Sequence, residues 1–145
     1  MAYDSPRYNA PRELANIRAT FAGGLKGTTA GNTNQQTSAN LDDRLEFFNK
    51  IKLTGFKALP EVAPDCGSHD TSQTVYFELC QGTVTKARAT VGTVAGVMGD
   101  GTIVSANISA GTACNIRASV TGWDGTVQTM APGAVRCLIQ YQERL

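Results

Sequence analysis

The stretch AVRCLIQYQ, residues 134–142, has the clearest alternation of apolar and polar side chains in this sequence. Apolar side chains occupy every second position, at Val135, Cys137, Ile139 and Tyr141. Because successive side chains of a β-strand point to opposite faces, this pattern predicts a strand with one buried and one exposed face. The fold expected for the rest of the chain depends on how many other segments show the same two-residue period.

The period of two returns in several segments after residue 49. They are KIKLTGF (50–56), QTVYFELCQ (73–81), TVTKARATVGTVAGVM (83–98), TIVSANIS (102–109) and ACNIRASVTG (113–122). Residue pairs typical of tight turns lie between them, at Asp100-Gly101, Ala110-Gly111 and Asp124-Gly125. About seven or eight short strands at such spacing predict a mainly β protein with an antiparallel β-sandwich or jelly roll.

The N-terminal part has a different pattern, and a short amphipathic helix is predicted in PRELANIRATFAGG (11–24). Leu14, Ile17 and Phe21 fall on one helical face, and the two glycines that follow can end the helix. A helix this short needs a surface to lie on. Its apolar face would therefore pack either on a partner or on the protein's own body, and the sequence leaves both alternatives open.

A second short helix is predicted in NLDDRLEFFNK (40–50). Asn40 can cap its first turn, where acidic side chains follow that suit the positive end of the helix dipole. Its apolar face would consist of Leu41, Leu45 and Phe48. The fold expected for the whole chain is thus a β-sandwich with an extended N-terminal arm that contains one or two short helices.

Between the two predicted helices lies GTTAGNTNQQTSAN (27–40), which has no apolar side chain larger than alanine. Such a segment buries too little apolar area to offset the entropy of ordering itself. It is expected to be either a disordered linker or a strap that becomes ordered on another surface. The predicted organisation is an arm of residues 1–46 and a β-sandwich domain of residues 47–145.

Composition restricts the classes of partner. The chain has 145 residues, 41% of them apolar and 17% charged, with a net charge of +1. This length suits one domain with a real core, and so small a net charge attracts neither nucleic acid nor an anionic membrane. The first residues contain no apolar signal-peptide region, and no apolar run is long enough to span a membrane. Synthesis in a cytoplasm is expected, with little disulfide formation among the four cysteines.

The sequence assembles no catalytic or metal site. The chain has a single histidine, His69, which with Cys66 would make half of a zinc site, and no second pair completes it. GGLKGTT (23–29) lacks the Gly-Lys-Ser/Thr order of a phosphate loop. The carboxylates form no evident pair for general acid–base chemistry. No catalytic, metal-binding or cofactor-binding residue is therefore predicted, and the protein is expected not to be an enzyme.

Cationic and aromatic side chains have simple structural interpretations. Lys86, Arg88, Arg117 and Arg136 alternate with apolar positions and are expected on an outer sheet face, without the interleaved aromatics that bind single-stranded nucleic acid. Trp123, beside a predicted turn, would either cover the end of its own core or bind a partner or a sugar. The remaining cysteines, Cys80, Cys114 and Cys137, are expected in the core or on a sheet face.

The arm MAYDSPRYNAPRELANIRATFAGGLKGTTAGNTNQQTSAN (1–40), joined to alternating strands from Lys50 to Gln142, resembles the cement or decoration proteins of tailed-phage heads. In size and plan it is most similar to the jelly-roll cement proteins of short-tailed phages. The resemblance implies a non-enzymatic virion protein that is made in the host cytoplasm and lies on the capsid surface. Its implied partners are the major capsid protein and further copies of itself, as a dimer or trimer, without direct contact to nucleic acid or membrane.

On this interpretation the partner-binding residues lie mainly in the arm. They are Tyr3, Tyr8, Arg12, Leu14, Ile17 and Phe21, together with Trp123 in the sandwich. Two other functions have the same composition. One is a tail, neck or fibre-associated phage protein, which differs only in location. The other is a carbohydrate-binding sandwich, in which Trp123 and Tyr76 would form an exposed platform.

Overall fold

The fold was analysed on a computed structural model, which describes residues 12–21, 25–27, 34–37, 45–62, 74–91, 96–121, 128–130 and 134–143. Every regular element in these ranges is a β-strand. The strands are β1 (Arg12–Ala19), β2 (Leu25–Gly27), β3 (Asn34–Thr37), β4 (Ile51–Pro60), β5 (Thr74–Gln81), β6 (Val84–Val91), β7 (Gly99–Ile103), β8 (Asn107–Ile108), β9 (Cys114–Thr121), β10 (Gln128–Met130) and β11 (Val135–Glu143).

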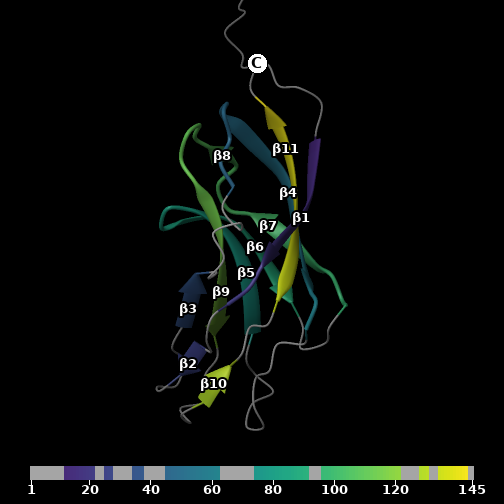
Figure 1. The fold of residues 1–145 in the computed structure, drawn as a ribbon, viewed down its shortest axis with the longest axis vertical. Coiled ribbons are helices and arrows are strands. Elements are labelled where there is room, and N and C mark those ends of the chain that lie inside the picture. The colour runs from purple at the N-terminus through teal and green to yellow at the C-terminus, as the bar shows by residue number, and fades with distance from the viewer. Residues whose placement is uncertain are drawn as a thin grey trace, which may run out of the picture.

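All strand pairs are antiparallel, and the strands follow the order β1-β11-β4-β7-β6-β5-β9-β3, with β8 paired to β4 (Figure 1). This continuous sheet folds over at β7, which pairs with β4 on one side and with β6 on the other. We call β1, β11, β4 and β8 the β4 sheet, and β6, β5, β9 and β3 the β5 sheet. The two sheets face each other, so the predicted antiparallel sandwich is confirmed. β2 and β10 form a separate pair.

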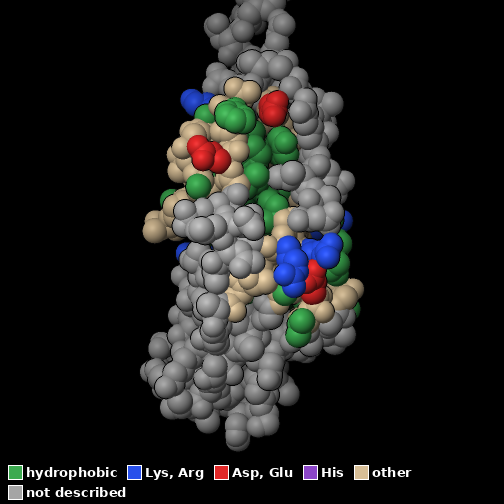
Figure 2. All heavy atoms as spheres, in the orientation of Figure 1, with side chains coloured by type: hydrophobic (Ala, Val, Ile, Leu, Met, Phe, Trp, Pro, Cys, Tyr) green, Lys and Arg blue, Asp and Glu red, His purple; other side chains and the backbone are tan. Residues whose placement is uncertain are grey.

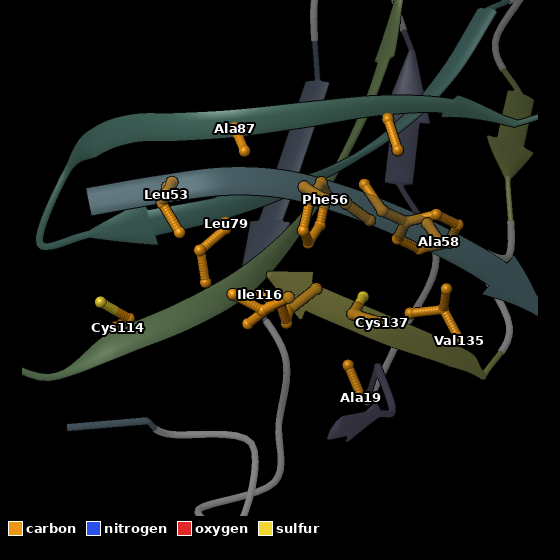
Figure 3. Close-up of a cluster of buried hydrophobic side chains, with 14 of the residues drawn as sticks. Ala19, Leu53, Phe56, Ala58, Leu79, Ala87, Cys114, Ile116, Val135 and Cys137 are labelled. Atoms are coloured by element: carbon orange, nitrogen blue, oxygen red, sulfur yellow. The ribbon is translucent and has the colours of Figure 1, made fainter. Parts of the chain in front are cut away.

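The core fills the space between the two sheets. On the face drawn in Figure 2, hydrophobic side chains of the described residues reach the surface only in places. Inside, the labelled side chains of Phe56, Leu79 and Ile116 point into the space between the strands (Figure 3), and each of them is at most 2% exposed. Both sheets thus contribute one apolar face to one core, as the alternating pattern requires.

The four clearest sequence alternations are confirmed as strands. In β11 the buried positions are Val135, Cys137 and Ile139, and Tyr141 packs partly buried against the core. β5 buries Val75, Phe77 and Leu79; β9 buries Cys114, Ile116 and Ala118; β4 buries Ile51, Leu53, Phe56 and Ala58. Between Leu53 and Phe56 the buried positions of β4 are three residues apart instead of two. The pairing of β4 with β11 shifts register at the same place, between Gln140 and Tyr141.

The place where the sheet folds over, at β7, depends on two glycines. A Cβ atom on Gly99 would lie 2.2 Å from the backbone oxygen of Thr90 in β6, and one on Gly101 would lie 2.2 Å from that of Phe56 in β4. β7 therefore fits between the two sheets only because these positions carry no side chain. The predicted turn at Asp100-Gly101 is wrong, since both residues lie inside β7. The predicted turn at Ala110-Gly111 is confirmed, and Gly111 has a φ of 70°.

The helix predicted over residues 11–24 is wrong where the structure describes it, because Arg12–Ala19 forms β1 and pairs with β11. The physical reason is a register shift between Leu14 and Ile17. These two residues pair with Ile139 and Cys137, which lie two positions apart on β11. One additional residue in β1 thus turns the strand period of two into a spacing of three, which imitates a helical face.

The helix predicted over residues 40–50 is also wrong in its described part. The backbone of Leu45 donates to Cys114 O at 3.0 Å and accepts from Cys114 N at 2.6 Å. Both main-chain groups are therefore used in an isolated β-bridge. Phe47 is buried and Phe48 is exposed. Phe48 therefore does not join Leu45 on the apolar helical face that the sequence predicts. Asn40 and Leu41 lie outside the described residues.

The N-terminal strands occupy the two open edges of the folded sheet. β1 lies at the outer edge of the β4 sheet, and β3 lies at the outer edge of the β5 sheet. After β1, Phe21 packs on the core with its ring centroid 5.8 Å from that of Phe77 in β5. The described parts of the N-terminal segment thus pair with the body of the protein, while a domain boundary at residue 46 stays a prediction.

Candidate functional site

Strand β4 runs from one end of the sandwich to the other. Its ten residues, Ile51–Pro60, span roughly 30 Å at the rise of an extended strand. We call the end that precedes Ile51 the Phe48 end and the end that follows Pro60 the Glu61 end. Each end has its own exposed apolar and charged groups, and each is considered below.

Phe48 is the most exposed large apolar side chain of the described residues, with 99% of its surface open to water. Its position is fixed by its neighbour. Phe47 is 7% exposed, packs edge-on against Tyr141 at a centroid distance of 5.1 Å, and accepts a backbone hydrogen bond from Gly111. Phe47 is anchored in the core, and the chain bends at Phe48, whose side chain lies in solvent.

The Phe48 end is built from three chain segments that are linked by hydrogen bonds. The Gln81 side chain donates to the carbonyl groups of Ser109 and Thr112 and accepts from the Ser109 N–H. Val104 donates its N–H to Lys86 O. Val84 and Val104 are the other exposed large apolar residues of this region, at 54% and 59%. The Phe48 end therefore combines a hydrogen-bonded frame with exposed apolar side chains.

The Glu61 end carries an ion-pair cluster made of one carboxylate and two guanidinium groups. Arg18 Nε of β1 lies 2.7 Å from Glu61 Oε2, and Arg136 Nε of β11 donates to Glu61 Oε1. Hydrogen bonds from Arg136 and Arg18 lower the pKa of the Glu61 carboxyl below its ordinary value. A single glutamate thus joins the N-terminal strand to the strand beside it. Val62, Val97 and Met98 are exposed apolar residues near this end.

A second cluster of the same composition lies on the outer face of the β5 sheet. Glu78 is fully buried, and its Oε2 lies 3.0 Å from Arg88 Nη2 and 3.3 Å from Arg117 Nη2. Thr85 Oγ1 also donates to Glu78 at 3.0 Å. The predicted outer-face residues Arg88 and Arg117 both pair with a buried acidic residue that the sequence analysis did not single out, whereas Lys86 donates to Asn107 O of β8. Among the described residues, Glu78 Oε1 has no hydrogen-bond partner.

The aromatic platform considered for a sugar-binding module is not free on the described side. Arg88 lies over the ring of Tyr76, with its guanidinium carbon 4.8 Å from the ring centroid. This cation–π contact covers one face of the ring. Trp123, the other proposed member of the platform, lies outside the described residues.

The described thiols are buried and poorly reactive. Burial raises the pKa of Cys114 to about 11, and it raises the pKa of Cys80 as well. A thiol with a raised pKa forms little thiolate near neutral pH and reacts slowly. Cys137 is buried in β11. The expectation that these cysteines lie in the core or on a sheet face is confirmed, and Cys66 lies outside the described residues.

Within the ranges that the structure describes, no three side chains among His, Cys, Asp and Glu gather closely enough to hold a metal ion. The potential half-site at Cys66 and His69 falls outside those ranges and stays untested. The same ranges contain no helix with the length and apolarity needed to cross a bilayer.

Of the residues predicted to bind a partner, the structure describes four, which lie in β1 or directly after it: Arg12, Leu14, Ile17 and Phe21. Ile17 and Phe21 pack partly buried against the protein's own core, which answers the alternative that the sequence left open. Arg12 and Leu14 lie in β1, where their backbones pair with Tyr141 and Ile139. Tyr3, Tyr8 and Trp123 lie outside the described residues, so their roles stay predictions.

Phe48 and Glu61 are the functional candidates that sequence reasoning missed. The predicted helical period placed Phe48 on an apolar face. In the structure Phe47 is the buried residue and the adjacent Phe48 is exposed. Glu61 directly follows a proline at the end of a long strand, and only the folded sheet brings it to Arg18, 43 residues away in the chain. No local pattern contains that contact.

Comparison with known proteins yields a likeness of structure alone. No protein-family model matches the chain, and no curated protein sequence matches it significantly. Two similar solved structures are those of infectious bursal disease virus, Gx and Gt strains. The Gx chain is 10% identical with a TM-score of 0.36, and the Gt chain is 11% identical with a TM-score of 0.34. In each case 95% of this chain aligns with 37% of the other, and a likeness at this level carries no argument about function.

Proposed function

We propose that the protein is a virion structural protein of the cement or decoration type, which binds the lattice of major capsid protein and stabilises the head. The observation that carries this proposal is Phe48, an aromatic side chain that is 99% exposed directly after the buried Phe47. Burying a phenylalanine side chain against a partner contributes about 1.5–3 kcal/mol. Aromatic anchors of this kind dominate the binding energy of protein interfaces.

The body of the protein suits a role as a rigid peg. One core joins both sheets, and the described polar side chains form ion pairs on the outer faces, at Glu61 and at Glu78. These clusters link neighbouring strands, and no histidine or reactive thiol accompanies them in the described residues. We infer that their role is to hold neighbouring strands together.

A repeated lattice strengthens a weak contact of this kind. Each copy presents one Phe48 end, and copies bound to adjacent capsid subunits share a high effective concentration. A modest apolar contact per copy therefore yields stable decoration of a shell without a large interface. Residues in the N-terminal segment, Tyr3 and Tyr8 among them, would add further contacts along the capsid surface.

The test uses particles of the virus whose genome encodes this chain. Phe48→Ser is compared with Val97→Ser, which removes an exposed apolar side chain from the opposite end of the sandwich. We expect Phe48→Ser to lower the affinity for particles stripped of the protein by about tenfold or more, the loss of at least 1.4 kcal/mol of apolar burial. We expect Val97→Ser to bind like the parent protein. Equal binding by the parent and Phe48→Ser would overturn the proposal.

A further inference from the structure

We propose that the outer face of the β5 sheet binds an internal water molecule through Glu78 Oε1, Arg117 Nε and Ser119 Oγ. These three side-chain atoms are buried, and none of them has a hydrogen-bond partner among the described residues. We call them together the Glu78 site. The proposal assigns a ligand to a part of the molecule that the proposed function does not use, and it stands independently of that function.

The three side chains lie on one face of two neighbouring strands. The residues on either side of Glu78 in β5 belong to the core, so Glu78 points to the outer face. In β9 the core residue Ala118 separates Arg117 from Ser119, which places both of these side chains on the outer face as well. All three members of the Glu78 site therefore share one side of the sheet.

The strand register brings the three side chains within reach of one another. Glu78 is directly opposite Arg117, and Ser119 follows at the next outward position of β9. Opposite side chains of an antiparallel pair have Cβ atoms about 5 Å apart, and diagonal ones about 7–8 Å. The long side chains of Glu78 and Arg117 can therefore meet one small molecule beside the Ser119 hydroxyl.

The ion pairs of this cluster use only part of its polar atoms. Glu78 Oε2 accepts hydrogen bonds from Thr85, Arg88 and Arg117 at 3.0–3.3 Å. Arg117 makes this contact through Nη2, which also donates to Thr85 Oγ1 at 2.8 Å. The contacts thus gather on one oxygen of the carboxylate and one nitrogen of the guanidinium group. Glu78 Oε1 and Arg117 Nε are left for another ligand.

Burial makes unpaired polar atoms costly at this place. Glu78 is 0% exposed and Ser119 is 1% exposed. Buried polar groups of native proteins nearly always have a hydrogen-bond partner, and an ordered water supplies it where the protein does not. The same burial leaves no opening for a large molecule. A ligand of the Glu78 site is therefore small.

The chemistry of the three atoms identifies that ligand. A carboxylate oxygen only accepts, so the ligand must donate to Glu78; the Nε–H group only donates, so the ligand must accept from Arg117. An anion cannot donate to Glu78, and a metal cation cannot accept from Arg117. Water does both, its remaining capacity suits the Ser119 hydroxyl, and about three hydrogen bonds are usual for a buried water.

The test observes the Arg117 Nε–H group by NMR in the full-length protein. Nuclear and rotating-frame Overhauser effects between water and this proton distinguish, by their signs, a long-lived bound water from proton exchange. We expect a long-lived water contact at Arg117. Arg136 is the internal reference, because its Nε already donates to Glu61 and its side chain is 48% exposed. We expect only short-lived water there, and absence of the long-lived contact at Arg117 would overturn the inference.

Ser119→Thr and Ser119→Val form a matched pair of variants. Threonine and valine have nearly the same shape and both suit a strand, but only threonine keeps the hydroxyl group. We expect Ser119→Thr to keep the water contact at Arg117 and Ser119→Val to weaken it by at least about threefold, since the water loses one of three partners. Equal contacts in the two variants would contradict the role of Ser119.

A crystal structure of the parent protein gives a second measurement that needs no variant. We expect a water peak within about 2.7–3.2 Å of all three atoms of the Glu78 site. Density without a water there, or a protein group in its place, would overturn the inference. Neither measurement involves virus particles, so the outcome is separate from that of the Phe48→Ser test.

Discussion

Arg18 of β1 and Arg136 of β11 lie directly opposite each other in the strand register, although both side chains are positively charged. Like charges in this position normally weaken a strand pair. Here the Glu61 carboxylate accepts a hydrogen bond from each guanidinium group. The attachment of the N-terminal strand therefore depends on a carboxylate that belongs to neither strand.

We expect Glu61→Gln to loosen β1 without unfolding the sandwich, because it leaves two facing arginines without a counter-charge. Amide exchange over residues 12–19 should become about two- to fivefold faster. Hydrogen exchange followed by mass spectrometry measures this, with Glu46→Gln at an exposed position as the control. An unchanged exchange rate in β1, or equal acceleration across all strands, would contradict the role assigned to Glu61.

The same cluster gives β1 an acid-sensitive attachment. Because its arginine partners lower the pKa of Glu61 in the folded state, its contribution is fully present above the ordinary glutamate pKa of 4.5. The contribution is lost as the pH falls through the lowered pKa. We expect the protection of β1 relative to β5 to be constant above about pH 5 and to fall below the ordinary pKa. In Glu61→Gln this acid-dependent part should disappear, and its persistence would point to another carboxyl group.

A side chain at Gly101 in β7 is expected to lower the stability of the fold. In Gly101→Ala the new Cβ atom would lie 2.2 Å from the backbone oxygen of Phe56, which cannot move without shifting β4. We expect a loss of at least about 2–3 kcal/mol in the free energy of unfolding, measured by denaturant titration. Gly55→Ala is the matched control, because its close contact is the flexible end of Gln140. Its cost should stay near or below about 1 kcal/mol, and equal costs would show that the corner tolerates a side chain.

The buried carboxylate of the β5 sheet is expected to matter more than any exposed charge. Glu78→Ala leaves Arg117, whose side chain is 16% exposed, without its ionic partner. Removing one member of a buried ion pair typically costs 3–5 kcal/mol, and we expect a loss of about that size. Glu46→Ala, at an exposed position, should change stability by less than about 0.5 kcal/mol. A small effect at Glu78 would mean that water replaces it easily.

The strands of the sandwich could be predicted from sequence because each turns an apolar face to the core. In β11 and β5 the apolar residues recur at every second position, and both alternations coincide with observed strands. Regular pairing needs no information beyond this local period. The fold class therefore follows from the sequence alone.

The N-terminal errors arose where pairing is irregular. Between Leu14 and Ile17 a register shift adds one residue to β1, and the resulting spacing matches a helix better than a strand. Asp100-Gly101 has the composition of a turn, but Gly101 is needed for the close approach of β7 to β4. In both cases the deciding contact comes from a strand distant in sequence, so no local pattern could identify it.

The candidate site was hidden for a related reason. Glu61, Arg18 and Arg136 come from three separated segments, and their charges become a cluster only after β1 pairs with β11. Phe48 was assigned to an apolar face, whereas Phe47 occupies the buried position beside it. The contacts of Phe47 with Tyr141 and Gly111, both distant in sequence, hold this ring in the core.

The central claim, that this protein decorates a viral shell, is tested most directly by electron cryo-microscopy of the virus particle that encodes it. We expect density for the β-sandwich on the outer surface of the capsid, at junctions between major capsid subunits, with the Phe48 end against the shell. Particles with no copy on the capsid surface, or copies bound with Phe48 facing solvent, would contradict the account.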